Sequence, residues 1–176
     1  MKVYILGIFI LFSLSFCSNT KKDFSGQDIS DKNFTSSDMK GSKFVNSKAV
    51  NALFSNSKLE KCDFTDAKLK GAKFDYSKLN GSIFKKADLF GADFTGADLR
   101  DADLSGLDLR NADFTNSNLA GANFKDSDLD GAIFNGALLD RAEFTGANVD
   151  LEQIFNARSK YKTILPYGTN YEKMKK

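Results

Sequence analysis

The sequence predicts an all-β fold, a square solenoid in which each coil takes twenty residues. Three observations lead to this prediction. Large apolar residues recur at every fifth position from Phe24 to Ile154, small residues lie two positions before most of them, and glycine often lies two positions after them. Internal repetition of this kind governs the architecture of a whole chain.

The two inward registers are nearly unbroken. Of the 27 large positions 26 are Phe, Leu, Ile, Met or Val, with Ala49 as the exception, and 22 of the 27 small positions are Ala, Ser or Cys. An α-helix turns about 100° per residue, so a step of five spreads these positions around the cylinder. A flat strand also fails, because five is odd and successive large residues would face opposite sides. Short extended segments joined by right-angled corners place every pair inside.

The corners are predicted just after each large residue. Eleven glycines share one phase there, interspersed with Asn and Asp, and all three residue types tolerate turn dihedrals. The small register leaves room for one large side chain per wall. Leu107 is the one large residue in that register between Ser37 and Ala147, so we expect local widening of the coil around it.

Phenylalanine follows a longer period of ten residues, which corresponds to two walls. It occupies most such positions from Phe24 to Phe144, so Phe is expected on opposite walls, stacked over Phe one coil away. With four repeats per coil, 27 repeats make 6.75 coils. At a strand spacing of about 4.8 Å the predicted rod is about 32 Å long, with backbone ladders on all four walls.

This pattern resembles the pentapeptide-repeat family, whose consensus is A-[DN]-L-x-x, over residues 22–156. Segments such as Ala97-Asp98-Leu99 carry the resemblance. It implies a right-handed quadrilateral β-helix. The small register departs from the family pattern at Lys22, Gln27 and Lys32. The first coil is therefore expected to be loose or partly exposed.

A cap is expected at the far end, because an open solenoid end exposes apolar core and unpaired strand edges. Asp150 is the predicted N-cap of a short helix over residues 151–157, with Leu151, Ile154 and Phe155 on one face. Residues 150–176 are thus predicted to form a capping helix and a basic tail.

The N-terminus has the features of a secretion signal over residues 1–16. Lys2 precedes an apolar run of 14 residues, Val3 to Phe16, which is too short for a membrane span. The following Leu14-Ser15-Phe16-Cys17 resembles the lipobox of bacterial lipoproteins, which implies lipidation of Cys17 and a lipidated tether over residues 17–21. An ordinary secretion signal before an incidental cysteine is the alternative. If Cys17 is lipidated, Cys62 is the only remaining thiol in the protein. An intrachain disulfide is then excluded.

No catalytic, metal or cofactor site is predicted. The chain has no His, and its many Asp residues occupy equivalent exposed positions, whereas catalytic carboxylates need different environments. Asp88, Asp108 and Asp128 are twenty residues apart and should stack on one wall. A solvated face is the simpler interpretation of this stack, and a surface for a cation or a basic partner is the alternative. Cys62 lies in the small register and is predicted to fill the core.

Charge is segregated along the predicted rod. Residues 21–86 hold 14 basic and 8 acidic residues (+6), residues 87–150 hold 4 and 13 (−9), and residues 151–176 hold 6 and 2 (+4). The basic section beside a lipid anchor could contact anionic headgroups. Alternatively, these lysines only keep the solenoid soluble and protect its edges.

These features favour a non-enzymatic, lipid-anchored envelope protein, on the periplasmic side or the cell surface, that acts as a rigid structural or protein-binding module. The expected partners are the membrane, a protein of unknown identity and, through the first coil, a second copy end to end. No nucleic acid is expected. The family resemblance implies an alternative, because some members imitate duplex DNA and bind gyrase. An envelope enzyme would need a pocket that a packed coil does not leave.

Overall fold

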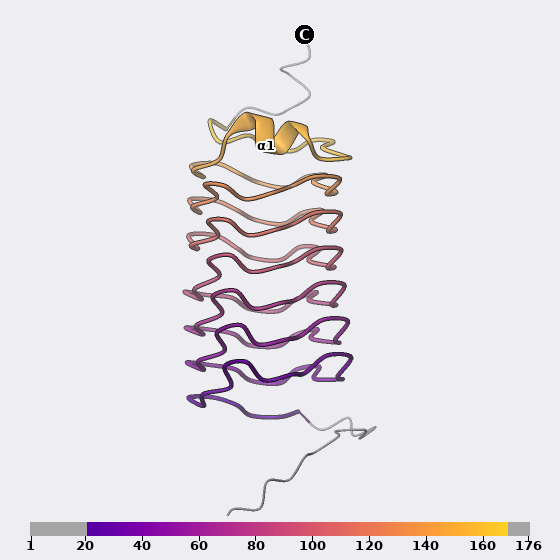
Figure 1. The fold of residues 1–176 in the computed structure, drawn as a ribbon. Helices are drawn as coiled ribbons and strands as arrows, with labels where there is room; N and C mark the ends of the chain where they lie inside the picture. The colour runs from indigo at the N-terminus through magenta and orange to yellow at the C-terminus, as the bar shows by residue number, and fades with distance from the viewer. Residues whose placement is uncertain (1–20, 169–176) are drawn as a thin grey trace, which may run out of the picture.

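The structure, a computed structural model, describes residues 21–168 as a stack of square coils (Figure 1). Parallel β-bridges join residues twenty positions apart, from Asp23 with Lys43 to Asp128 with Asn148, and they recur at every fifth residue. Each coil therefore has four walls, as the sequence predicts. Each wall contributes a single bridged residue, and α1 (Leu151–Phe155) is the one helix among the described residues.

The interior is a continuous apolar column built from both registers. Every fifth side chain from Phe44 to Phe144 is completely buried. Phe94 stacks on Phe74 with ring centroids 5.1 Å apart and on Phe114 at 5.2 Å, and it meets Phe84 edge-on at 6.2 Å. The predicted stacking of Phe on opposite walls is confirmed. Offset and edge-on aromatic pairs add to the stability that burial alone gives.

The corners are turns with one left-handed residue. All 25 positions at five-residue steps from Gly26 to Gly146, eleven Gly and fourteen others, have φ between +54° and +75°. The turn closes with a backbone hydrogen bond such as that from Gln27 N–H to Phe24 O (3.0 Å). This combination is characteristic of type II turns, in which glycine and asparagine are the favoured third residues.

The first coil pairs normally with the second but is more exposed. Phe24 N–H donates to Lys43 O at 2.8 Å, as in every regular rung. Phe24 is only partly buried, and Gln27 and Lys32 are exposed in the register where small residues lie elsewhere. The expected partial exposure is confirmed, whereas the backbone ladder shows no loosening.

The ladder opens at one place, between the coil of residues 81–88 and the coil of residues 101–108. Five inter-coil hydrogen bonds that are regular on most other coils are weakened here, although the bridges from Ile83 to Asp103 and from Asp88 to Asp108 remain: Gly81 N–H to Arg100 O, Phe84 N–H to Asp103 O, Lys86 N–H to Ser105 O, Asp103 N–H to Ser82 O, and Asp108 N–H to Ala87 O. Leu107 lies one coil above Ala87, so a large buried side chain stands at this level in the register that is small elsewhere. The predicted widening is confirmed, and it runs along the rod axis.

The distal end is covered by α1. Asp150 accepts from Glu152 N–H (3.0 Å), the Gln153 side chain accepts from Asp150 N–H (2.7 Å), and Ile154 is completely buried. The predicted N-cap is confirmed. The helix is shorter than expected, and Phe155 is 45% exposed, so its predicted inward position is wrong. Asn156 accepts from Gly136 N–H (3.1 Å), which returns the chain to the coil directly after Phe155.

The solenoid continues beyond α1. Ser159 is bridged to Leu138 and Ile164 to Glu143. These partners are 21 residues apart, so the coil that contains the helix is one residue longer than the others. Leu165 is buried, and Pro166 O still accepts from Gly146 N–H. Coil structure therefore extends past residue 156. In the part of the chain that the structure describes, no helix is long and apolar enough to cross a membrane.

Candidate functional site

The predicted acidic stack exists on one wall. Asp88 is bridged to Asp108 and Asp108 to Asp128, so the three residues lie directly above one another on successive coils. Identical charges at the spacing of neighbouring strands, about 4.8 Å, repel one another unless a counter-charge is present. The stack is therefore the first place to look for a bound partner.

An arginine of the same chain supplies that counter-charge. Arg110 donates from Nε to Asp108 Oδ1 (2.9 Å) and from Nη2 to Oδ2 (2.7 Å), and its Nε lies 3.7 Å from Asp128 Oδ2. The hydrogen bonds from Arg110 hold the pKa of Asp108 below its usual range. Arg110 thus occupies the position considered for a cation. Residues 21–168 contain no group of three or more His, Cys, Asp or Glu side chains that could hold a metal ion.

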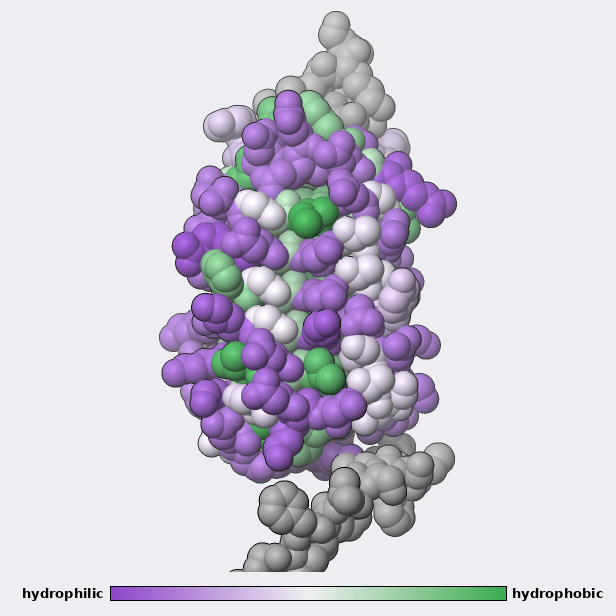
Figure 2. Space-filling view, in the orientation of Figure 1, coloured by the Kyte–Doolittle hydropathy of each residue, from purple (hydrophilic) through white to green (hydrophobic). Residues whose placement is uncertain are grey.

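The corner beside this wall holds an aromatic–cation column that the sequence analysis missed. The ring of Phe90 has Lys70 Nζ 4.9 Å from its centroid and the Arg110 guanidinium carbon 5.4 Å away. These three residues are also twenty positions apart, so extending the period to the outward corner residues would have found them. The column covers an otherwise exposed aromatic ring with charge. On the face in Figure 2, apolar side chains form separate spots among polar ones.

We expect Arg110→Gln to lower the free energy of unfolding slightly at low salt, because it leaves the acidic stack uncompensated. The loss should shrink as salt screens the repulsion. It should also shrink as pH falls through the lowered pKa of Asp108, since the paired carboxylate stabilises the fold only when it is ionised. Denaturant unfolding measures this effect. Arg100→Gln is the matched control, because Arg100 pairs bidentately with Asp98 outside the stack. Equal salt dependence in both variants would contradict this account.

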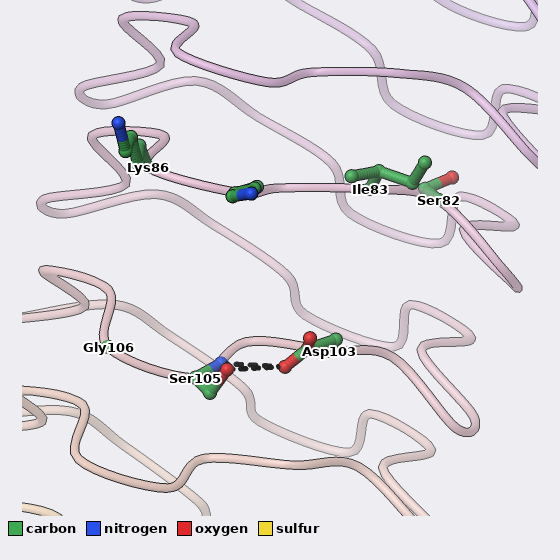
Figure 3. A pocket seen from close by; sticks show the side chains of 7 residues that line it. Ser82, Ile83, Lys86, Asp103, Ser105 and Gly106 are labelled. Carbon is green, nitrogen blue, oxygen red and sulfur yellow. Dashed lines mark hydrogen bonds between the residues drawn. The ribbon is translucent and has the colours of Figure 1, made fainter.

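The open rung forms a surface cleft of about 470 Å³. Ser82, Ile83 and Lys86 line the cleft from one coil, and Asp103 and Ser105 line it from the next coil (Figure 3). Asp103 Oδ1 already accepts from the Ser105 hydroxyl (2.6 Å) and from Asn123 Nδ2 (3.1 Å). Lys86 points away from the gap (Figure 3). Lys85 also lines the cleft, and no His or Cys is among its lining residues.

Cys62 is an inert core residue, as predicted. It is completely buried, burial raises the pKa of its thiol to about 12, and Sγ donates to Met39 O at 3.0 Å. A thiol with so high a pKa is a poor nucleophile at neutral pH. The other predicted site residue, Cys17, lies outside the described residues.

A square solenoid with inward Phe and Leu and outward polar walls defines a class of repeat protein with a filled apolar core and a polar surface. The model of the family described as Pentapeptide repeats matches the chain at residues 50–85, 69–106, 87–126 and 117–150. Together these ranges cover residues 50–150, or 101 of 176 residues. The chain belongs to the pentapeptide-repeat family, whose members form right-handed quadrilateral β-helices.

Several solved structures resemble the chain. A pentapeptide repeat protein from the Arabidopsis thaliana thylakoid lumen is 25% identical, with 84% of this chain and 86% of that chain covered and a TM-score of 0.41. Full-length QnrB1, a plasmid-mediated fluoroquinolone resistance protein, is 14% identical (88% and 94% covered, TM-score 0.41). Rfr23 from the cyanobacterium Cyanothece 51142 is 21% identical (78% and 91% covered, TM-score 0.40). A search of curated protein sequences finds no match.

Proposed function

We propose that this protein is a non-enzymatic, lipid-anchored component of the bacterial envelope that acts as a rigid structural or protein-binding module. The observation that carries this proposal is the packing of the solenoid. Its interior is filled from Phe44 to Phe144, and its walls present side chains rather than a catalytic cavity. A surface of this kind can bind a partner along its length without changing shape.

The proposed anchor is Cys17, in the segment Leu14-Ser15-Phe16-Cys17. Residue 21 and α1 lie at opposite ends of the rod (Figure 1). Lipidation of Cys17 would therefore hold one end of the solenoid near the membrane. The basic section of residues 21–86 is the part nearest this anchor, where lysines interact favourably with anionic headgroups.

A DNA-mimicking role is the second candidate, and the net charge of −9 over residues 87–150 favours it. Two features weigh against it. Arg100 and Arg110 neutralise Asp98 and Asp108 within the acidic section. Basic sections also lie on both sides of it, whereas duplex DNA presents an uninterrupted negative field. Export to the envelope would separate the protein from gyrase as well.

The lipid anchor is tested by acyl labelling of Cys17→Ala in growing cells. We expect the variant to lose the acyl label and its salt-resistant membrane association, because stable anchoring by lipid requires the acyl chains. Cys62→Ala is the matched control, since it removes the other cysteine and should leave both properties unchanged. Acyl label on the Cys17→Ala protein, or membrane retention without label that survives a high-salt wash, would refute the lipoprotein assignment.

A further inference from the structure

The last coil carries a set of exposed aromatic side chains. Within residues 21–168, six large hydrophobic side chains are exposed, and three of them lie in this coil: Phe155 (45%), Tyr161 (57%) and Tyr167 (85%). The other three, Tyr76, Ile83 and Ile133, are spread over the remainder of the rod. The concentration at one end is thus a property of the distal coil alone.

Backbone hydrogen bonds place these aromatics at three different corners of the square. Phe155 precedes Asn156, whose carbonyl accepts from Gly136 N–H at 3.1 Å. Tyr161 O accepts from Arg141 N–H at 2.8 Å, and Tyr167 follows Pro166, whose carbonyl accepts from Gly146 N–H at 2.8 Å. The three residues at positions 136, 141 and 146 occupy successive corners. The aromatics therefore form a rim, the distal rim, around the end that α1 covers.

Cations accompany the rim. Residues 151–168 contain Arg158, Lys160 and Lys162 against Glu152 alone, a net charge of +2 directly beyond the acidic section. Lys162 Nζ lies 5.2 Å from the ring centroid of Tyr161, and Lys160 Nζ donates to Ala157 O at 2.6 Å. Aromatic rings and cations thus share the last coil of the rod.

This combination matches the chemistry of a lipid headgroup layer. Tyrosine places an apolar ring and a polar hydroxyl at a membrane interface, and neighbouring Lys and Arg attract anionic headgroups. A protein hot spot, in contrast, gathers its aromatic anchors in one packed central patch. The rim spaces its aromatics around a square instead. We propose that the distal rim binds an anionic lipid surface end-on, with Tyr161 and Tyr167 in the headgroup layer.

This contact is independent of Cys17, so it can be tested without the anchor. The chain from Ser18 onward keeps the whole described solenoid and lacks both the apolar leader and Cys17. We expect it to co-sediment with phosphatidylcholine–phosphatidylglycerol vesicles and to bind pure phosphatidylcholine vesicles much more weakly. The variant Phe155→Ser/Tyr161→Ser/Tyr167→Ser should bind the anionic vesicles about tenfold more weakly than the parent chain does.

The matched control is Tyr76→Ser/Ile83→Ser/Ile133→Ser, which removes the same number of exposed large hydrophobics from other parts of the rod. It should bind as the parent chain does. Lys160→Gln/Lys162→Gln should weaken binding to anionic vesicles by about tenfold and reduce its salt dependence. Circular dichroism establishes that each variant is folded. No binding by the parent chain, equal binding to neutral vesicles, or equal losses in the two triple variants would overturn the proposal.

Discussion

Replacing Phe94 with alanine is expected to lower the free energy of unfolding by about 3 to 5 kcal/mol. Phe94 is completely buried in the middle of a stack, between the rings of Phe74 and Phe114. Its removal leaves a cavity that the neighbouring rungs cannot close, because their spacing is set by backbone hydrogen bonds on both sides. Urea unfolding followed by circular dichroism measures the loss.

Asp93→Ala is the control for Phe94→Ala, since it changes the adjacent residue on the outward side. Asp93 accepts a hydrogen bond from Thr95 N–H at 3.0 Å near the surface. Its replacement should lower stability by about 0.5 kcal/mol, as expected for a surface substitution. Similar losses at Phe94 and Asp93 would mean that the assignment of inward and outward registers is wrong.

The second large effect is expected at the open rung, from the double variant Leu104→Phe/Leu107→Ala. Leu104 interrupts a column of phenylalanines, and Leu107 enlarges a position that is small elsewhere. The double variant restores both registers and should let the two coils close. Each restored backbone hydrogen bond contributes about 0.5 to 1.5 kcal/mol, so full restoration of five of them would stabilise the protein by about 2.5 to 7.5 kcal/mol.

Amide hydrogen exchange locates this gain. Exchange should slow at Phe84, Lys86, Asp103 and Asp108, whose N–H groups make weakened ladder contacts in the parent protein. Leu104→Phe alone should not slow exchange at these sites, because Leu107 still separates the coils. Unchanged exchange in the double variant would show that Leu107 is not the cause of the opening.

The architecture could be predicted because a five-residue period is incompatible with both a helix stripe and a flat strand. The same registers predicted that Phe94 is buried and that Cys62 fills the core. The period, the corners and the N-cap at Asp150 all depend on residues close in sequence. Contacts between side chains of neighbouring coils were harder to predict. The twenty-residue register must be known before outward residues can be assigned to one another.

Two features show this difference. Arg110 lies only two residues from Asp108, yet its role depends on Asp128 in the next coil, so the acidic stack alone suggested an external cation. Phe155 has the spacing of an inward helical residue, but the return of the chain at Asn156 turns it outward. The distal rim could not be predicted, since it requires knowing that the coil resumes after α1.

The central claim is that the rod works by binding an envelope protein, and cross-linking in intact cells tests it most directly. A photoreactive amino acid is placed at outward wall positions, with Asp93 and Asp113 as examples, and at the inward Phe94 as the control. We expect the same envelope protein to be captured from the outward positions and not from Phe94. Capture of gyrase from the outward positions would contradict both the binding role and the export on which it depends.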